Sequence, residues 1–292
     1  EMRLVTGVQT CPLPISKSIV IIGAGAIGLE FATMFNSLGS KVTVIEMRDK
    51  ILPLEDNEIS QELLKIMKRK GITFKLSSAV KEITHAEATL EIVYVNKDKE
   101  SSLLGEKILI AVGRKLNSDC SELTNLELLL DKGAIVVNEN MATNVEGVYA
   151  AGDIVGGKLL AHVAFMEGKV AAENALGLSS CVNYNAAPSC VYTNPEVASV
   201  GINEDEAIKL GNEIKVGRFN FRNNGRALCL GEREGFVKVI TDKYNTIIGG
   251  QILGVNASEI ISELTLAITL KAKADVLRSE EHTYELQSQD AS

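Results

Sequence analysis

The sequence predicts an α/β protein that begins with a Rossmann-like domain and ends with an α+β domain. A β-branched run at residues 19–22 leads directly into a glycine-rich bend, which is typical of a buried strand that turns into a helix. Strand-like and helix-like segments then alternate along the chain. From residue 189 the pattern changes to a series of strands followed by a closing helix.

The glycine-rich bend has the spacing GxGxxG, with glycines at Gly23, Gly25 and Gly28 and with Ala26 and Ile27 before the last of them. In a strand–turn–helix unit the first glycine allows a tight turn, the second lets a pyrophosphate approach the backbone, and the third lets helix and strand pack closely. Free N–H groups and the positive end of the helix dipole would face the phosphates. A flexible loop can show the same spacing, but the flanking strand and helix favour dinucleotide binding.

An acidic residue stands where such a site contacts the adenosine ribose. Glu46 ends a second predicted strand, residues 41–46, about twenty residues beyond the bend. A carboxylate there accepts hydrogen bonds from the ribose hydroxyls and repels a 2′-phosphate, which favours NAD over NADP. The alternative is a solvated carboxylate at the end of a strand.

Two helices are expected in this first domain. The helix that opens in the bend carries apolar residues at helical spacing, which we expect to form its buried face: Ile27, Phe31, Met34, Phe35 and Leu38. A second helix is expected from about Asp56, with Ile59, Leu63, Ile66 and Met67 on one face. The basic run at its end, residues 68–70, is interpreted as a solvated helix terminus rather than an anion site.

Further strands are expected at residues 71–76, 79–85, 90–95 and 107–112, and the middle ones alternate as an antiparallel insert would. Residues 96–102 are expected to form the hairpin turn between two of these strands. Gly113 follows the last strand and is a candidate for a second wall of the nucleotide site. A short strand at residues 147–150 leads to Asp153, a carboxylate where ligands of open α/β sheets bind. A helix follows at residues 160–176. His162 near its start is interpreted as a structural histidine, with a ligand as the alternative.

The last part of the chain is expected to start after a boundary at residues 183–188. Strands are expected at residues 190–193, 197–200, 214–219, 236–241 and 247–253, with helices at 204–210 and 258–270. This order is typical of an α+β domain rather than of a second doubly wound sheet.

Composition excludes several classes of protein. The 292 residues carry a net charge of −8, which argues against a nucleic-acid partner or an anionic membrane surface. We find neither a membrane-spanning run nor a signal peptide, and we expect a cytoplasmic protein. The cysteines show neither CxxC nor metal-ligand spacing, so we expect reduced structural thiols and no metal site: Cys11, Cys120, Cys181, Cys190 and Cys229.

Both ends of the chain look foreign to the fold. Residues 5–16 resemble a translated sequencing adaptor, and residues 278–288 resemble the opposite strand of that adaptor. We therefore expect residues 1–16 and 278–292 to be non-native and exclude them from the reasoning on the fold. A genuine tail of unusual composition is the alternative.

Eight motifs in register extend the comparison beyond the bend: GAGAIGLE, VTVIE, AVGRKLN, GVYAAGD, LLAHVAFMEG, YTNPEVASVG, FRNNGRAL and GGQILGVNASEII. Their order resembles the flavin-dependent pyridine nucleotide-disulfide oxidoreductases, and the dihydrolipoyl dehydrogenase branch most of all. The resemblance covers about residues 17–277. It implies an NAD-binding domain at residues 17–116, part of a central FAD-binding domain at 117–186, and a dimerisation domain at 187–277.

The resemblance also implies an activity and a set of sites. Such enzymes pass an electron pair from dihydrolipoamide to a redox disulfide and through FAD to NAD+. NAD would be held by residues 23–30 and Glu46, with Val80 and Gly113 lining its pocket. Glu30 would lie near the flavin. Asp153 would bind the ribityl chain of FAD, and four residues would contact the flavin through their backbone: Leu159, Leu160, Ala161 and His162. The implied partners are a second copy of the chain and the lipoyl domain of a 2-oxo acid dehydrogenase or glycine cleavage complex.

The sequence departs from the family at the catalytic groups. The CxxxxC pair is absent from the printed sequence, and the positions that align with the family's catalytic histidine and glutamate hold Thr283 and Ser288. We therefore expect a fragment without catalytic residues of its own, lacking the first FAD-binding segment and the C-terminal tip. Two alternatives stay open: another disulfide reductase acting on glutathione, mercuric ion or coenzyme A disulfide, and a non-catalytic module that binds nucleotide or dimerises.

Overall fold

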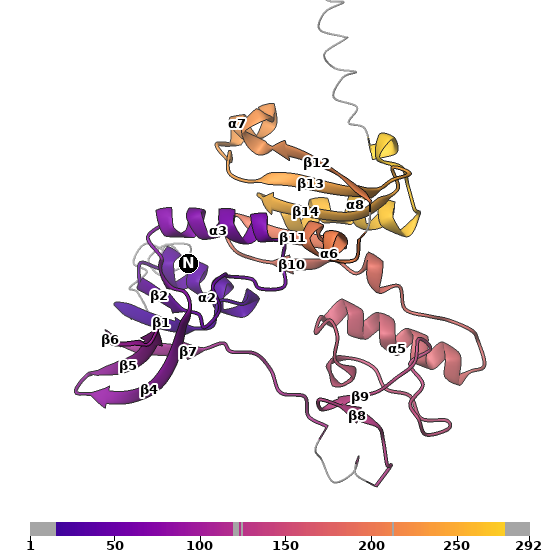
Figure 1. Ribbon diagram of the computed structural model, residues 1–292, viewed down its shortest axis with the longest axis horizontal. Helices are drawn as coiled ribbons and strands as arrows, with labels where there is room; N and C mark the ends of the chain where they lie inside the picture. The colour runs from indigo at the N-terminus through magenta and orange to yellow at the C-terminus, as the bar shows by residue number, and fades with distance from the viewer. Residues whose placement is uncertain (1–15, 119–122, 124, 212, 278–292) are drawn as a thin grey trace, which may run out of the picture. The chain divides into compact units, whose positions relative to one another are not determined.

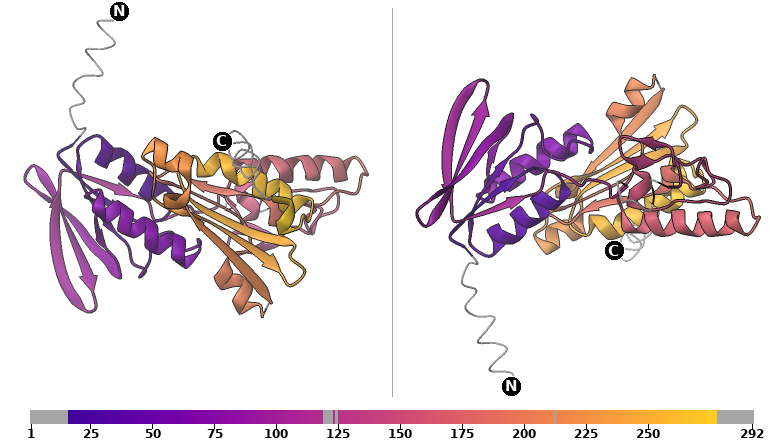
Figure 2. Two further views of the ribbon diagram at one scale, coloured as in Figure 1. Left: turned by 90° about the horizontal axis from the view of Figure 1, so that it is seen from above. Right: turned by 90° about the horizontal axis from the view of Figure 1, so that it is seen from below.

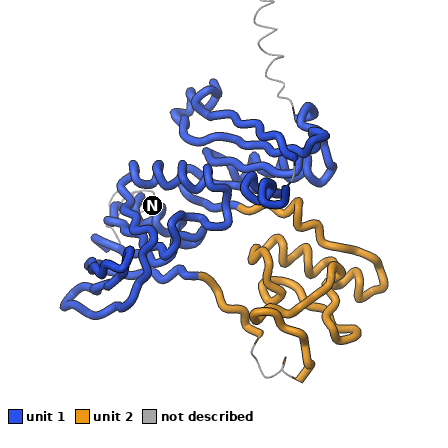
Figure 3. The backbone as a smooth tube through the Cα atoms, viewed as in Figure 1, with its two compact units in different colours: residues 1–112, 190–292 blue, residues 113–189 orange. Residues whose placement is uncertain are grey.

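The structure is a computed structural model that describes residues 16–118, 123, 125–211 and 213–277. Its contacts divide the chain into two compact units (Figure 3). The first unit contains the described residues up to Val112 and those from Cys190 onward, and the second contains residues 113–189. The domain boundaries expected from the sequence stay predictions, as does the non-native origin of the two ends, which lie almost wholly outside the described residues.

The first unit opens with a parallel sheet in the order β3-β2-β1-β7 (Figure 1). Its strands are β1 (Ser18–Ile22), β2 (Lys41–Ile45), β3 (Thr73–Lys75) and β7 (Lys107–Ile110). The helices α2 (Ala26–Ser37) and α3 (Asn57–Arg69) connect β1, β2 and β3. This alternation of parallel strands and helices is the Rossmann-like arrangement that the sequence predicts.

Alternate residues of β1 face two different layers. Ile19 and Ile21 pack in a cluster with residues of α2 and α3. Val20, between them, packs instead against Ile92 and Tyr94 of a three-stranded antiparallel sheet. That sheet (Figure 2) consists of β4 (Ser78–Ala86), β5 (Thr89–Asn96) and β6 (Lys99–Gly105). The parallel sheet is therefore covered on both faces at β1 and β2, which is why these two strands are mostly apolar.

The same unit contains an antiparallel sheet in the order β10-β11-β14-β13-β12. Its strands are β10 (Ser189–Val191), β11 (Glu196–Gly201), β12 (Ile214–Asn220), β13 (Phe236–Asp242) and β14 (Ile247–Gly254). Three helices accompany it: α6 (Glu204–Lys209), α7 (Gly225–Leu230) and α8 (Ala257–Thr269). Val191, Val197 and Phe236 join the cluster that contains α2 and α3, so the two sheets share one core.

The second unit is smaller and has little sheet. It contains β8 (Leu130–Asp131), β9 (Ala134–Ile135) and the helix α5 (Ala161–Ala175). Short 3-10 turns lie at η1 (Asp153–Val155) and η2 (Tyr184–Ala186). The prediction of a strand at residues 147–150 is wrong, because the backbone there makes only an isolated bridge between Tyr149 and Ala142.

Two other expectations are corrected. Residues 96–102 are not a turn: Lys97 and Asp98 alone reverse the chain, both at positive φ, and β6 follows directly. On α2 the buried residues are Gly28, Leu29 and Ala32, whereas Ile27, Phe31 and Met34 are 42, 38 and 41% exposed. The close approach of α2 to the sheet at Gly28 turns the face with Gly28, Leu29 and Ala32 inward, so Ile27, Phe31 and Met34 lie on the flank of the helix.

Candidate dinucleotide-binding site

The parallel pairing of β1 with β2 brings the glycine bend and the acidic residue together. Ile22 pairs with Ile45, and the amide of Gly23 donates to the carbonyl of Ile45 at 2.8 Å. The next residues along both strands therefore meet at one edge of the sheet. The amide of Ala24 donates to Glu46 Oε2 at 2.7 Å, and Glu46 is only 8% exposed. The glycine bend and Glu46 are therefore joined directly by a hydrogen bond.

The three glycines of the bend have three different surroundings. A Cβ on Gly23 would lie 2.3 Å from the carbonyl oxygen of Ala111, and Gly23 has a φ of +105°. A Cβ on Gly28 would lie 2.0 Å from the carbonyl oxygen of Gly23. A Cβ on Gly25 would meet no atom within 4 Å. The fold itself therefore requires Gly23 and Gly28, whereas no contact with the protein requires glycine at position 25.

The helix that follows the bend starts without a side-chain cap. Gly25 is the N-cap of α2 and offers no side-chain acceptor, whereas α3 and α7 are capped by Asp56 and Asn224. Uncapped amides at a helix start, together with the positive end of the helix dipole, favour an anion. With the open space beside Gly25, this geometry fits the diphosphate of a dinucleotide.

Glu46 is held in place by the backbone on both sides. Its Oε2 accepts from Ala24 and its Oε1 accepts from the amide of Arg48 at 2.8 Å. Each carboxylate oxygen can accept more than one hydrogen bond, so ribose hydroxyls can still be bound. Val80 lies near this edge, because the amide of Ser78, two residues earlier, donates to the carbonyl of Glu46 at 2.9 Å. The ligand roles of Glu46 and Val80 stay predictions.

Glu30 joins the bend region to the second sheet of the unit. It lies on α2 one turn beyond Ala26 and Ile27, and its Oε1 accepts from the amide of Tyr192 at 2.9 Å. Tyr192 directly follows β10 and is 62% exposed. Glu30 therefore links α2, next to the glycine bend, to the end of β10 in the five-stranded sheet.

The remaining predicted residues lie in the second unit. Gly113 has a φ of +115°, and Arg114 pairs with Asp153 at 2.6 Å. Leu159, Leu160, Ala161 and His162 lie at the start of α5, whose N-cap Leu160 gives no side-chain cap. His162 Nε2 lies 2.8 Å from the carbonyl oxygen of Pro188, which agrees with the structural role expected for it. The flavin contacts of these residues stay predictions.

Sequence reasoning missed a buried carboxylate in this second unit. Glu167 is 2% exposed, and it accepts from the amide of Gly152 and from the hydroxyl of Tyr184, both at 2.7 Å. It therefore ties α5 to the residue before Asp153. The signal was present: Glu167 lies between Val163 and Val170 at helical spacing, so one charge interrupts an apolar face.

This contact gives a testable pH dependence. Burial, followed by the hydrogen bond to Glu167 and the charge of that residue, raises the pKa of Tyr184 to about 12. The folded state keeps the hydroxyl proton of Tyr184 to a higher pH than the unfolded state does. The contact between Tyr184 and Glu167 therefore contributes fully to stability below about pH 10, and this contribution is lost as the pH rises towards 12. We expect Glu167→Gln to lower the pKa of Tyr184. Ultraviolet titration of tyrosinate checks this, with Tyr184→Phe identifying the step; an unchanged titration in Glu167→Gln would contradict it.

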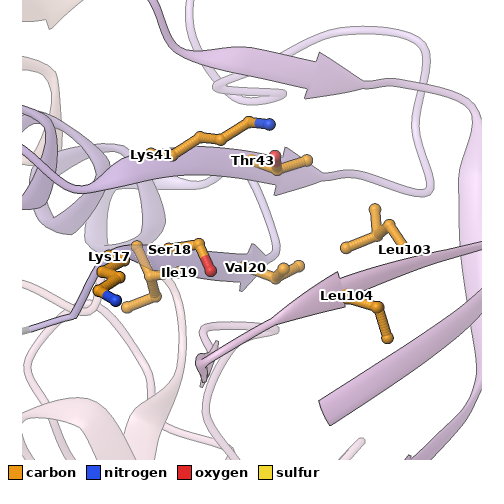
Figure 4. Close-up of a pocket in the computed structure, with 8 residues that line it drawn as sticks. All are labelled: Lys17, Ser18, Ile19, Val20, Lys41, Thr43, Leu103 and Leu104. Carbon is orange, nitrogen blue, oxygen red and sulfur yellow. The ribbon is translucent and has the colours of Figure 1, made fainter. Parts of the chain in front are cut away.

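A cavity of about 460 Å³ lies elsewhere in the first unit (Figure 4). It is lined by the starts of β1 and β2 and by β6, through Lys17, Ser18, Ile19, Val20, Lys41, Thr43, Leu103 and Leu104. Gly23 and Glu46 follow the opposite ends of the same strands. The cavity is therefore separate from the candidate site.

The described part of the chain shows neither a metal site nor a membrane-spanning helix. No group of three or more His, Cys, Asp or Glu side chains there is arranged to hold a metal ion. No helix among those residues has the length and apolar character needed to cross a bilayer. Three cysteines within the described ranges are free thiols, namely Cys181, Cys190 and Cys229. Cys11 and Cys120 lie outside the described residues.

Comparison with known proteins gives consistent matches over both parts of the chain. The family described as pyridine nucleotide-disulphide oxidoreductase matches residues 4–168, and its dimerisation domain matches residues 187–288. A dihydrolipoyl dehydrogenase of Bacillus subtilis (strain 168) is 41% identical over 88% of this chain and 55% of its own length. Dihydrolipoyl dehydrogenase 2 of Haloarcula marismortui is 37% identical over 92% of this chain and 58% of its own length. The chain thus spans little more than half the length of these relatives.

Solved structures agree with the sequence matches. LpdA from Mycobacterium tuberculosis superposes with a TM-score of 0.84 at 27% identity, over 91% of this chain and 59% of that one. The HOCl-induced flavoprotein disulfide reductase RclA from Escherichia coli superposes with a TM-score of 0.81 at 26% identity, over 94% and 63% of the two chains. With a family match over more than half of its residues, the chain belongs to the pyridine nucleotide-disulphide oxidoreductases.

Proposed function

We propose that this chain binds NAD and is part of an NAD-dependent dihydrolipoyl dehydrogenase that also uses FAD. The observation that carries the proposal is the glycine bend: Gly25 has open space beside it, α2 starts uncapped, and Glu46 is hydrogen-bonded to the same bend. The curated relatives named dihydrolipoyl dehydrogenase, at 37 and 41% identity, support the choice of enzyme.

Each predicted site residue would have its own role in binding the two cofactors. Amides at the start of α2 would bind the diphosphate, Glu46 would orient the ribose and exclude a 2′-phosphate, and Val80 and Gly113 would line the pocket. Asp153 and the start of α5 would hold FAD. When bound, NAD+ supplies a hydride acceptor and FAD a carrier for the electron pair. A buried Glu46 beside neutral amides is well placed to discriminate between the two nicotinamide cofactors.

The proposed setting is cytoplasmic, as a homodimer whose dimerisation domain starts near residue 187. The match of that part to a family dimerisation domain supports the homodimer. The proposed partner of the parent enzyme is the lipoyl domain of a 2-oxo acid dehydrogenase or glycine cleavage complex. Because no two cysteines of the chain have the CxxxxC spacing, this chain alone is expected to bind nucleotide without turning over lipoamide.

Gly25→Ala tests the proposal. Gly25 has φ −76° and ψ −176°, which alanine adopts without strain, and the added methyl group meets no atom of the protein. The variant should therefore be as stable as the wild type, yet bind NADH at least about ten-fold more weakly, or about 1.4 kcal/mol. NADH fluorescence titration and thermal unfolding measure the two quantities.

Gly225→Ala is the matched control, since a Cβ there also meets no atom within 4 Å and the residue lies on α7, far along the chain from the bend. It should leave NADH affinity unchanged. Equal NADH binding by wild type and Gly25→Ala would overturn the diphosphate assignment. Tighter binding of NADPH than of NADH by the wild type would favour the other disulfide reductases over a dihydrolipoyl dehydrogenase.

A further inference from the structure

A lysine of the five-stranded sheet is buried among three carboxylates, two at the start of α3 and one on α6. Lys238 lies on β13, and its side chain is 2% exposed. Its Nζ lies 3.0 Å from Asp56 Oδ1, 2.9 Å from Glu58 Oε2 and 2.9 Å from Glu204 Oε2. Burial lowers the pKa of Lys238, but hydrogen bonds to Glu204, Glu58 and Asp56 raise it by more. The ammonium group is therefore a fixed positive charge.

Asp56 is the member of this cluster that also binds the backbone at the start of α3. It is the N-cap of α3, and its Oδ1 accepts from the amide of Glu58 at 2.9 Å while it also binds Lys238. Its carboxylate is 2% exposed. A buried carboxylate that lost its cation would be strongly disfavoured, so Lys238 determines whether Asp56 can stay where it is.

From Asp56 the contacts lead back to the glycine bend. The loop between β2 and α3 is closed by Ser60 Oγ, which donates to the carbonyl of Leu52 at 3.2 Å, and by the amide of Glu55, which donates to the same carbonyl at 2.9 Å. The amide of Leu52 donates to the carbonyl of Ala24 at 2.9 Å. Leu52 itself has a φ of +42°, a conformation that a leucine keeps only where surrounding contacts impose it.

We propose that Lys238 is a positioning residue for the nucleotide site: it fixes Asp56 and the loop of Leu52, which in turn holds Ala24 and the glycine bend. That the bend binds a nucleotide rests on the proposed function, whereas the contacts that lead from Lys238 to Ala24 do not depend on it. The nucleotide site of the N-terminal part would thus depend on a side chain from the C-terminal sheet. The alternative is a purely structural cluster whose loss destabilises the whole unit evenly.

Amide hydrogen exchange on the full chain, without ligand, tests the chain of contacts. In Lys238→Met the peptide covering Leu52 should exchange about ten-fold faster than in the wild type, while peptides covering β1 and β14 change by less than about two-fold. Lys215→Met is the matched control, because Lys215 lies exposed on the neighbouring strand β12 and bonds Asn245. It should leave all these peptides unchanged. An even rise in exchange over the unit, or no rise at Leu52, would overturn the proposal.

A NADH titration of the same variants separates this inference from the proposed function. Lys238→Met should bind NADH about ten-fold more weakly than the wild type, and Lys238→Arg, which keeps the charge and its donors, should recover most of the affinity. If the wild type binds no NADH but Leu52 still exchanges faster in Lys238→Met, the proposed function fails and the contact chain stands. If Leu52 is unaffected although NADH binds, the positioning role fails alone.

A second pair of variants covers the case in which Lys238→Met does not fold. Asp56→Asn and Glu204→Gln each remove one carboxylate from Lys238, but only Asp56 adjoins the loop, and asparagine is still a good N-cap. Asp56→Asn should speed exchange at Leu52, whereas Glu204→Gln should not. Equal effects of the two substitutions would overturn the proposal.

Discussion

Gly28→Ala is expected to lower the free energy of unfolding by about 2–3 kcal/mol, although alanine is the better helix former. The new Cβ would lie 2.0 Å from the carbonyl oxygen of Gly23 and 3.1 Å from its carbonyl carbon. Gly23 cannot move easily, because its amide is hydrogen-bonded to the carbonyl of Ile45. Denaturant unfolding followed by circular dichroism measures the change.

Gly168→Ala is the control for this prediction. Gly168 also lies within a helix, α5, but a Cβ there meets no atom within 4 Å. With no clash to oppose helix propensity, this substitution should stabilise the protein by up to about 1 kcal/mol. If Gly28→Ala proved as stable as the wild type, the close approach of α2 to the sheet would be contradicted.

Glu46→Ala is expected to reduce both NADH affinity and stability. Removal of the carboxylate leaves the amides of Ala24 and Arg48 without their acceptor, and Ala24 is fully buried, so unfolding should be easier by about 1–3 kcal/mol. Loss of the proposed hydrogen bonds from Glu46 to the ribose should weaken NADH binding about ten-fold or more. The preference for NADH over NADPH should also fall, because the charge that repels a 2′-phosphate is gone.

Two other variants separate these effects. Glu46→Gln keeps an acceptor oxygen for the bend but not the charge, so it should lose less stability than Glu46→Ala while still losing discrimination against NADPH. Glu100→Ala removes an exposed carboxylate that pairs with Lys81, and should change neither property appreciably. An unchanged ratio of NADH to NADPH affinity in Glu46→Ala would contradict the assignment of Glu46 to the ribose.

The sequence pattern predicts a helix or strand correctly where the residues of that element alone show the periodicity. The helix expected from Asp56 begins at Asn57 with Asp56 as its cap, and it buries Ile59, Leu63, Ile66 and Met67 as expected. The order of strands after residue 189 was likewise anticipated, since alternation and β-branched residues are local features. Polarity alone does not reveal β6: its residues 99–102 are charged and polar, which is typical of a turn, but they form a strand at the edge of its sheet, where polar side chains are tolerated.

The sequence alone determined the family, through the resemblance of eight motifs in order along the chain. It also determined the position of the dinucleotide motif and its acid, because a strand, a GxGxxG bend, a helix and a carboxylate follow one another within about thirty residues. Only the tertiary structure decided which glycine serves the fold and which leaves room for a ligand, which face of α2 is buried, and that Lys238 lies against Asp56, 182 residues earlier in the chain. The physical reason is that periodicity and spacing report contacts within one element. Contacts between distant elements depend on how closely backbones approach and which charges are buried together, and neither is written in local pattern.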